Sequence, residues 1–247
     1  MSGHSKWSTI KRAKGVVDAK RSKIFTRLTR EITLAARTGV DPEKNPRLRL
    51  AVQKARDNNM PRDNIDRAIK KASGGDGNTA SLDEITYEAY GPGGVAILLE
   101  VVTENRKRTA ADVKAALNKS GGSMGEAGSV SWMFRTNGVL TVAAVGDEAD
   151  AIALSAIDAG AEDFMVDDDA VEIYCSPGAI EDIRSIMESE GVAVTNAEIT
   201  QVPTTTVAVD SGLADQTIKL LEKLEDLDDV QRVSTNAEFP QDLFADS

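Results

Sequence analysis

The residues best suited to chemistry lie at the start of the chain, where cationic side chains surround a tryptophan. Lys6, Lys11, Arg12 and Lys14 flank Trp7 in a stretch whose glycines and serines predict a flexible arm. Such arms follow phosphate backbones, and an aromatic ring that stacks on an unpaired base contributes ~1–3 kcal/mol. An equally good interpretation has Trp7 anchoring the arm on the protein's own surface. The arm therefore predicts contact with a polyanion, and the role of its tryptophan stays open.

A predicted helix that follows the arm extends this positive surface. From Val16 to Arg37 the apolar residues recur with the period of a helix, and Gly39 ends it. The basic residues fall on a face that adjoins the apolar one: Lys20, Lys23, Arg27, Arg30 and Arg37. The alternative is a solvated helix face. Because the row continues the charge of the arm, polyanion binding is favoured.

A second polar cluster consists of Asn105, Arg106, Lys107 and Arg108, where a predicted strand meets a predicted helix. The unpaired N–H groups at the start of a helix also attract anions. The cluster is therefore a second candidate for phosphate contact, although surface solubility explains it equally well.

Two aromatic residues beyond this cluster receive a different interpretation. In the segment SVSWMF, which reads as a strand, Trp132 and Phe134 alternate with Met133. Alternate residues of a strand share one face. We therefore expect both rings to pack in the core.

Catalytic residues are hard to assemble from this sequence. His4 is the only histidine and lies in the arm, and Cys175 is the only cysteine, so neither a catalytic triad nor a zinc site can be built. The chain has no G-x-x-x-x-G-K-S/T phosphate loop, and GGSMGEAG is interpreted as a plain loop. Three consecutive aspartates, 167–169, more often form a solvated turn than a cation site. The sequence predicts a protein that is not an enzyme and has no metal or cofactor.

Charge is divided unevenly along the chain. The whole protein has 29 basic and 40 acidic residues and a net charge of -11. Residues 1–75 contain 19 Lys and Arg and 7 Asp and Glu, whereas residues 76–247 contain 10 and 33. This division suggests that the first part meets a polyanion while the rest keeps the protein soluble and repels the polyanion. The alternative is that the basic part pairs with the acidic body.

Composition also indicates where the protein works. A single cysteine excludes an internal disulfide and fits a reducing compartment. No apolar run approaches the ~20 residues of a membrane helix. We expect a soluble, cytoplasmic protein with no membrane partner and no small-molecule substrate. An organelle transit peptide is the alternative explanation of the basic start.

The periodicity of apolar residues predicts an α+β protein of three domains. Residues 1–75 read as a basic helical domain, with helix starts at Asn45-Pro46 and Met60-Pro61. Residues 135–202 follow the β-α-β-β-α-β order of a ferredoxin-like fold. Residues 76–134 and 203–247 lack complete cores of their own. We therefore expect them to form one middle α/β domain, into which the ferredoxin-like domain is inserted.

Several long segments closely resemble the YebC/PmpR family, which includes the mitochondrial translational activator of cytochrome c oxidase. The segments that carry the resemblance are MSGHSKWSTIKRAKGVVDAKRSKIFTRLTREI, NPRLRLAVQKARDNNMPRDNIDRAIKK, YEAYGPGGVAILLEVVTENRKRTAADVK, GSVSWMF and LEDLDDVQRV. They cover almost the whole chain apart from residues 143–200, and the match from Met1 argues against a transit peptide. The resemblance implies three domains around a cleft and no enzymatic activity. Bacterial members are described as regulators that bind promoter DNA, and other work on the family points to the ribosome and to translation of proline-rich stretches.

Three functions remain as hypotheses. The first is a DNA-binding transcriptional regulator. The second is a ribosome-associated factor that contacts ribosomal or transfer RNA. The third is an interaction protein whose acidic body binds a basic partner. The sequence has no clear recognition helix that would read base edges in the major groove, which suits a shape-reading RNA binder at least as well as a DNA reader. We predict a non-enzymatic, nucleic-acid-binding regulator of gene expression, specifically a DNA-binding transcriptional regulator. The ribosome-associated translation factor is the alternative.

Overall fold

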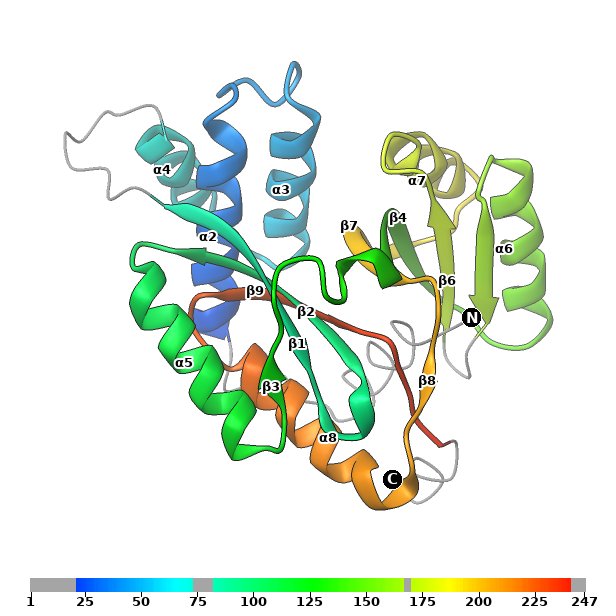
Figure 1. The fold of residues 1–247 in the computed structure, drawn as a ribbon. Helices are drawn as coiled ribbons and strands as arrows, with labels where there is room; N and C mark the ends of the chain where they lie inside the picture. Colours follow the sequence, from blue (N-terminus) through cyan, green and yellow to red (C-terminus); the bar gives the residue numbers. More distant parts are fainter. Residues whose placement is uncertain (1–20, 73–81, 167–169, 241–247) are drawn as a thin grey trace. The chain divides into compact units, whose positions relative to one another are not determined.

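The structure is a computed structural model and describes residues 21–72, 82–166 and 170–240. The chain divides into two compact units (Figure 1). The first comprises Met1–Arg27, Asn78–Arg135 and Gln201–Ser247, and the second comprises Leu28–Gly77 and Thr136–Thr200. Each unit joins segments that lie far apart in the sequence. No helix in the described ranges combines the length and the apolar composition of a membrane span.

A four-stranded antiparallel sheet forms the centre of the first unit. Its strands lie in the order β3-β1-β2-β9 and span Ser123–Met124, Asp83–Tyr90, Ala96–Thr103 and Val230–Thr235. The segment GGSMGEAG is therefore not a plain loop, because it contributes β3 to the edge of this sheet. A short 3-10 helix, Pro92–Gly94, connects β1 to β2, and Gly93 has a φ of 74°, which favours glycine. A separate parallel pair consists of β8 (Val207–Ala208) and β10 (Ala237–Glu238).

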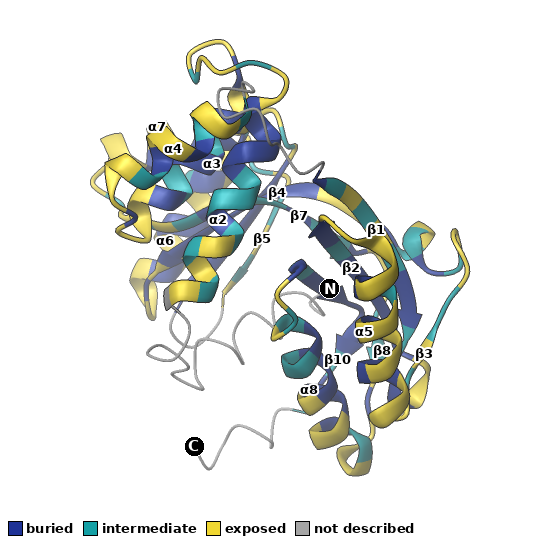
Figure 2. Cartoon of the chain, turned by 90° about the vertical axis from the view of Figure 1, so that its left-hand side faces the viewer, coloured by how far each residue is buried: buried dark blue, intermediate teal, exposed yellow. Residues whose placement is uncertain are grey.

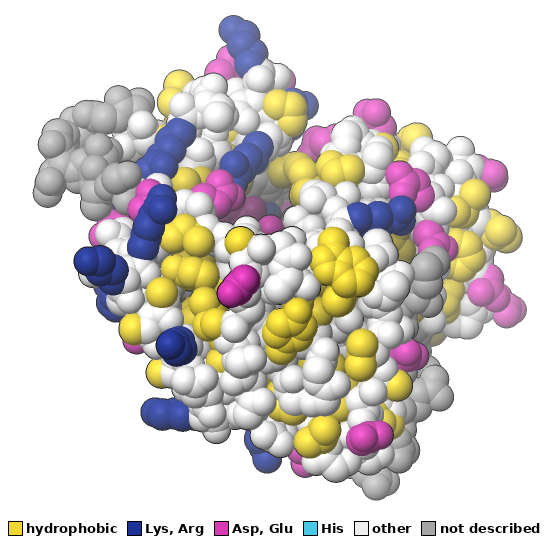
Figure 3. All heavy atoms as spheres, viewed as in Figure 1, with side chains coloured by type: hydrophobic (Ala, Val, Ile, Leu, Met, Phe, Trp, Pro, Cys, Tyr) yellow, Lys and Arg dark blue, Asp and Glu magenta, His cyan; other side chains and the backbone are white. Residues whose placement is uncertain are grey.

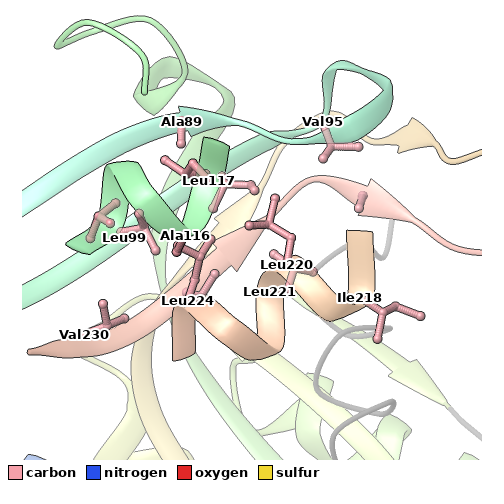
Figure 4. Close-up of a cluster of buried hydrophobic side chains, with 14 of the residues drawn as sticks. Ala89, Val95, Leu99, Ala116, Leu117, Ile218, Leu220, Leu221, Leu224 and Val230 are labelled. Carbon is pink, nitrogen blue, oxygen red and sulfur yellow. The ribbon is translucent and has the colours of Figure 1, made fainter. Parts of the chain in front are cut away.

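Two helices pack on one face of this sheet, α5 (Arg106–Lys119) and α8 (Ser211–Glu225). Leu99 of β2 lies in one buried cluster with Leu117 of α5 and Leu220 of α8 (Figure 4). Burial of each such side chain contributes ~1.5–3 kcal/mol to folding. This layer fixes α5, and with it the polar cluster at its first turn.

The opposite face of the sheet carries a smaller cluster and corrects one prediction. Val130 and Phe134 are buried there beside Ala96 and Leu98. The predicted strand over SVSWMF is wrong, because Ser131–Met133 form a 3-10 turn and β4 begins only afterwards. Phe134 is 8% exposed, as expected for a core residue, but Trp132 is 67% exposed, so its prediction as a core residue is also wrong.

Three helices precede the first sheet in the sequence: α2 (Arg21–Ala36), α3 (Pro46–Asp57) and α4 (Arg62–Ala72). The predicted start of α3 is confirmed, since the side chain of Asn45 accepts a hydrogen bond from the Leu48 N–H at 3.1 Å and Pro46 is the first helical residue. α4 follows Met60-Pro61 as predicted. Short local signals were sufficient to place these helices.

The second unit also contains a sheet with the order β5-β6-β4-β7. In chain order its elements are β4 (Phe134–Ala143), α6 (Asp147–Asp158), β5 (Asp163–Val166), β6 (Ala170–Cys175), α7 (Ile180–Ser189) and β7 (Val194–Pro203). The first and third strands are neighbours at the centre, which is the ferredoxin-like arrangement, and the predicted α+β fold is confirmed. We call residues 136–200 the insert. Figure 2 shows exposed residues along the outer side of α6.

The chain enters and leaves the insert through neighbouring segments. β4 and β7 are adjacent in the sheet. Just outside them, the N–H and the hydroxyl of Thr204 both donate to the carbonyl oxygen of Met133, at 2.7 and 2.9 Å. These bonds join the two connecting segments within the first unit.

Candidate nucleic-acid interface

The residues predicted to bind nucleic acid fall into three groups in the structure. Six of them lie outside the described residues: Lys6, Trp7, Lys11, Arg12, Lys14 and Lys20. The second group lies on α2 and, with Arg37, directly after it, and the third lies at the start of α5. The structure therefore bears on the second and third groups, and it gives them different surroundings.

The first two turns of α2 contact the end of α8. Lys23 Nζ donates to the carbonyl oxygen of Asp226 at 3.0 Å and lies 3.5 Å from its carboxylate. Arg27 donates to the carbonyl oxygen of Glu225. Cations at the C-terminal end of a helix are stabilised by its unpaired carbonyl groups and its dipole. This half of the predicted stripe therefore has a structural role, and a polyanion would have to compete with it.

The rest of the basic surface lies on the later part of α2 and on α3 and α4. Residues 21–72 contain 14 lysines and arginines and six acidic residues. Arg30 is half-buried and Arg37 is exposed. The prediction omitted further exposed cations on and beside α3 and α4: Lys44, Arg47, Arg56, Arg62, Arg67, Lys70 and Lys71. Figure 3 shows Lys and Arg side chains spread over the part of the surface where Figure 1 labels these helices.

Some cations of this region pair with acidic residues of the same unit. Lys54 Nζ lies 3.1 Å from the carboxylate of Glu198 and 3.8 Å from that of Glu31. Arg184 of the insert lies 3.6 Å from the carboxylate of Asp57. The alternative that the basic part pairs with the acidic body therefore holds for Lys54 and Glu198, whereas in the pair with Asp57 the insert supplies the cation. It does not explain why so many other cations face solvent.

The cluster at the start of α5 is mostly structural. The Asn105 side chain caps the helix by accepting the N–H of Arg108 at 3.1 Å. Arg106 Nε lies 2.7 Å from the Asp83 carboxylate, and this hydrogen bond and charge raise the pKa of Arg106. Lys107 is exposed, and no hydrogen bond or ion pair joins its side chain to another described residue.

Arg108 belongs to a network around a buried carboxylate. Its guanidinium lies 2.6 Å from Asp229 Oδ2, and the hydrogen bond and charge of Asp229 raise the pKa of Arg108. The hydroxyls of Thr109 and Thr103 donate to the same oxygen at 2.6 and 3.1 Å. Asp229 is 5% exposed. Arg108 therefore neutralises a buried acid, which limits what it can offer to a phosphate.

An aromatic site missed by the prediction lies on the loop before β4. The exposed indole of Trp132 donates through Nε1 to the carbonyl oxygen of Ser129 at 3.1 Å. A buried acid, Glu88, holds this loop by accepting the backbone N–H groups of Gly128, Val130 and Ser131 at 2.7, 2.6 and 2.9 Å. Burial alone would raise the pKa of Glu88, but these three bonds together outweigh it and lower the pKa.

The described residues offer no clear site for catalysis. None of them form a group of three or more His, Cys, Asp or Glu side chains that could hold a metal ion. The thiol of Cys175 is buried, and desolvation raises its pKa to about 11. A thiol with so high a pKa is a poor nucleophile at neutral pH. Residues 167–169 lie outside the described residues.

Comparison with known proteins gives consistent matches along the chain. Residues 5–75 match the model of the TACO1/YebC protein N-terminal domain, and residues 82–237 match that of the TACO1/YebC second and third domain. A probable transcriptional regulatory protein of Dehalococcoides mccartyi is 53% identical over 98% of this chain and 97% of its own. One from Thermomicrobium roseum is 50% identical over 98% of each chain. A crystal structure of a conserved hypothetical protein from Aquifex aeolicus has a TM-score of 0.82 and 42% identity, over 91% of this chain and 93% of that one.

Proposed function

Because the chain belongs to the TACO1/YebC family, whose curated relatives are named transcriptional regulatory proteins, we propose that it is a non-enzymatic, nucleic-acid-binding regulator of gene expression. It acts in the cytoplasm and binds DNA. The observation that carries the proposal is the basic surface on and beside α2–α4, where residues 21–72 hold 14 lysines and arginines against six acidic residues and most of these cations are exposed. In the proposal Lys6, Lys11, Arg12, Lys14 and Lys20 bind the same nucleic acid.

Phosphate groups are the proposed ligands of these cations. Arginine and lysine side chains that neutralise phosphates release counterions, which gives high affinity at low salt and a steep loss at high salt. Such contacts fix position on a nucleic acid without reading its sequence. Regulation through this surface therefore depends on the shape and charge of the target.

A second candidate function is contact with RNA on the ribosome, and Trp132 is the observation that favours it. An exposed ring on a loop held by Glu88 is pre-ordered, so stacking a base on it loses little conformational freedom. Unpaired bases of this kind are common in RNA loops and absent from intact duplex DNA. In this alternative the basic helices bind the RNA backbone and Trp132 stacks on a splayed base.

A titration of labelled nucleic acid separates the two candidates. Fluorescence anisotropy would follow a 20-base-pair DNA duplex and a 20-nucleotide single-stranded RNA. If about five phosphates are neutralised, the slope of log affinity against log salt is roughly -4.5 for duplex and roughly -3.5 for single strands. Reversing two exposed cations, Arg56→Glu with Lys71→Glu, is expected to weaken both complexes by about tenfold or more, and Trp132→Ala to weaken only the RNA complex.

A matched double charge reversal in the first unit, Lys114→Glu on α5 with Lys219→Glu on α8, controls for the overall loss of positive charge. An equal loss of affinity in this control would show that net charge, and not the surface of α2–α4, drives binding. Sedimentation of the native protein from gently lysed cells, with and without ribonuclease, then tests the cellular target. Co-migration with ribosomes that is lost at high salt would favour the RNA candidate.

A further inference from the structure

Exposed large hydrophobic side chains are concentrated in the insert. Nine such residues are found among the described parts of the chain, and six of them belong to the insert: Val145, Leu154, Ile157, Phe164, Val166 and Ile186. In Figure 3 hydrophobic and acidic side chains lie interleaved over the surface where Figure 1 labels α6. Single exposed apolar residues need no explanation, but a contiguous group indicates a binding surface.

The edge strand of the insert contributes two members of this group. β5 is the last strand in the order β5-β6-β4-β7, so one side of its backbone has no neighbouring strand among the described residues. Phe164 is opposite Ile173 and Val166 is opposite Val171 in the register with β6. Both partners belong to the core beneath the helices. Phe164 and Val166 therefore face the helix side of the sheet, at its rim.

Helix α6 brings further apolar side chains to the same rim. Its buried side, which includes Ala149 and Ala153, packs against the sheet. Ser155 donates to the carboxylate of Glu190 at the end of α7, so the flank that carries Ser155 faces α7. At 100° per residue, Ile157 lies on the other flank, which faces away from α7 and toward the β5 edge, and Leu154 lies beyond it on the outer side of the helix. Because α6 packs on β5, Ile157, Phe164 and Val166 form one surface, the β5 rim, with Leu154 at its outer margin.

The charge of the insert limits what can bind there. Residues 136–200 include 15 acidic residues and one basic residue, Arg184, which already pairs with Glu188 and Asp57. On the other face of the sheet, Asp163 lies at the start of β5, opposite Tyr174. That face is covered over β6, where Glu172 and Tyr174 are 2% and 6% exposed, whereas Asp163 is half-buried at the rim. A second copy would bring the same negative charge to the rim and be repelled, whereas a basic segment would be attracted.

We propose that the β5 rim binds a basic segment of a partner protein, which adds as a strand beside β5. Side chains alternate along such a strand. Every second residue would contact Phe164, Val166, Leu154 and Ile157, and must be apolar. The residues between them would project toward the other face at the rim of the sheet, near Asp163, and are basic. The predicted ligand is therefore a segment of alternating apolar and basic residues, and the site does not depend on nucleic-acid binding.

A simpler explanation covers only part of these observations. A short edge strand flanked by acids resists edge-to-edge aggregation, and β5 has four residues with Glu162 directly before it. Protection of the edge accounts for the acids. It does not account for exposed leucine, isoleucine and phenylalanine at the rim, where polar residues would protect the edge better.

The test uses the full-length protein and a fluorescein-labelled nine-residue peptide of alternating valine and lysine. Anisotropy is expected to show saturable binding that weakens about tenfold or more in the double variant Leu154→Gln with Phe164→Thr. Ile186→Gln provides the matched control, because Ile186 is 38% exposed, as Phe164 is 37%, but lies on α7. It is expected to leave affinity within about twofold.

Two further peptides test the geometry. A valine–glutamate peptide is expected not to bind the native protein. It is expected to bind the Asp163→Lys variant, and misfolding cannot produce such a gain of binding. A serine–lysine peptide is expected to bind at least about tenfold more weakly than valine–lysine.

Three results would overturn the proposal. Equal affinity for the serine–lysine and valine–lysine peptides would show that binding depends on charge alone and not on the apolar side chains of the rim. Retention of full affinity by the rim variant would place binding elsewhere. Self-association of the native protein that Phe164→Thr abolishes would assign the rim to a second copy of the chain.

Discussion

Two basic regions of the chain look alike in the sequence and differ in the structure. At the start of α5, Arg106 and Arg108 are each bound to a carboxylate, one of them the buried Asp229. On α3 and α4, cations such as Arg56 and Lys71 are exposed on helices whose packing does not need them. Local charge density therefore does not measure the charge that a ligand can meet. The charge available to a ligand depends on whether a carboxylate distant in the sequence already pairs with the cation.

The largest expected effect comes from removing the acid at the start of α5. Asp229→Ala leaves the buried hydroxyls of Thr103 and Thr109 without their shared acceptor and deprives Arg108 of its partner. The free energy of unfolding is expected to fall by about 3 kcal/mol, as measured by urea denaturation. Asp228→Ala, at the exposed neighbouring position, is the control and is expected to change stability by less than ~0.5 kcal/mol. A small effect of Asp229→Ala would mean that the two basic regions are equivalent after all.

Glu88 is a buried carboxylate held by backbone amides and by the Ser131 hydroxyl, so its replacement measures the contribution of a buried acid that is not bound to an arginine. Glu88→Gln weakens three hydrogen bonds and places an NH₂ group against N–H donors, so we expect a loss of about 2 kcal/mol at pH 7. The pKa of Glu88 is lowered from its ordinary 4.5 on folding, so its contribution is complete above that value and is lost as the pH falls through the lower folded pKa.

Denaturation curves of the native protein and Glu88→Gln from pH 7 to pH 3 test this prediction. The difference between them is expected to shrink as the medium becomes acidic. Glu84→Gln, an exposed position on the same strand, serves as the control. A difference that stays constant with pH would show that the ionised form of Glu88 does not hold the loop.

The smallest expected effect is at Lys107, the member of the α5 cluster that no described acid binds. Lys107→Ala is expected to change the free energy of unfolding by less than ~0.5 kcal/mol and nucleic-acid affinity by less than about threefold, because a single exposed cation contributes little. Denaturation and anisotropy measure the two quantities. A larger loss of affinity, comparable to that of Arg56→Glu with Lys71→Glu, would restore the start of α5 as a binding surface.

The sequence predicted those features that depend on near neighbours. Asn45-Pro46 and Asn105 identify helix starts because the capping bond reaches only three residues ahead. The β-α-β-β-α-β order followed from strand and helix periods, which are also local. These signals were sufficient for the α+β fold.

The features that the sequence did not predict depend on distant partners. Trp132 is exposed because Glu88, more than 40 residues earlier, bends the preceding loop, and no pattern within SVSWMF reveals that acid. The pairing of Arg108 with Asp229 spans 121 residues. A segment read by itself cannot show which of its cations pair with distant acids, so the sequence could not weigh these ion pairs against phosphate contact at the start of α5.

The bonds from Thr204 to Met133 have a consequence for how the protein can be rebuilt. They hold the two ends of the insert next to each other within the first unit, while the insert itself packs against Leu50 of α3 and pairs with Lys54 and Asp57. Domains with adjacent ends tolerate insertion and removal, because the host chain can be closed by a short turn. Joining Met133 to Thr204 through a few glycines would therefore give a shortened protein that keeps the first sheet, α5 and α8, and other acidic modules could be grafted in its place.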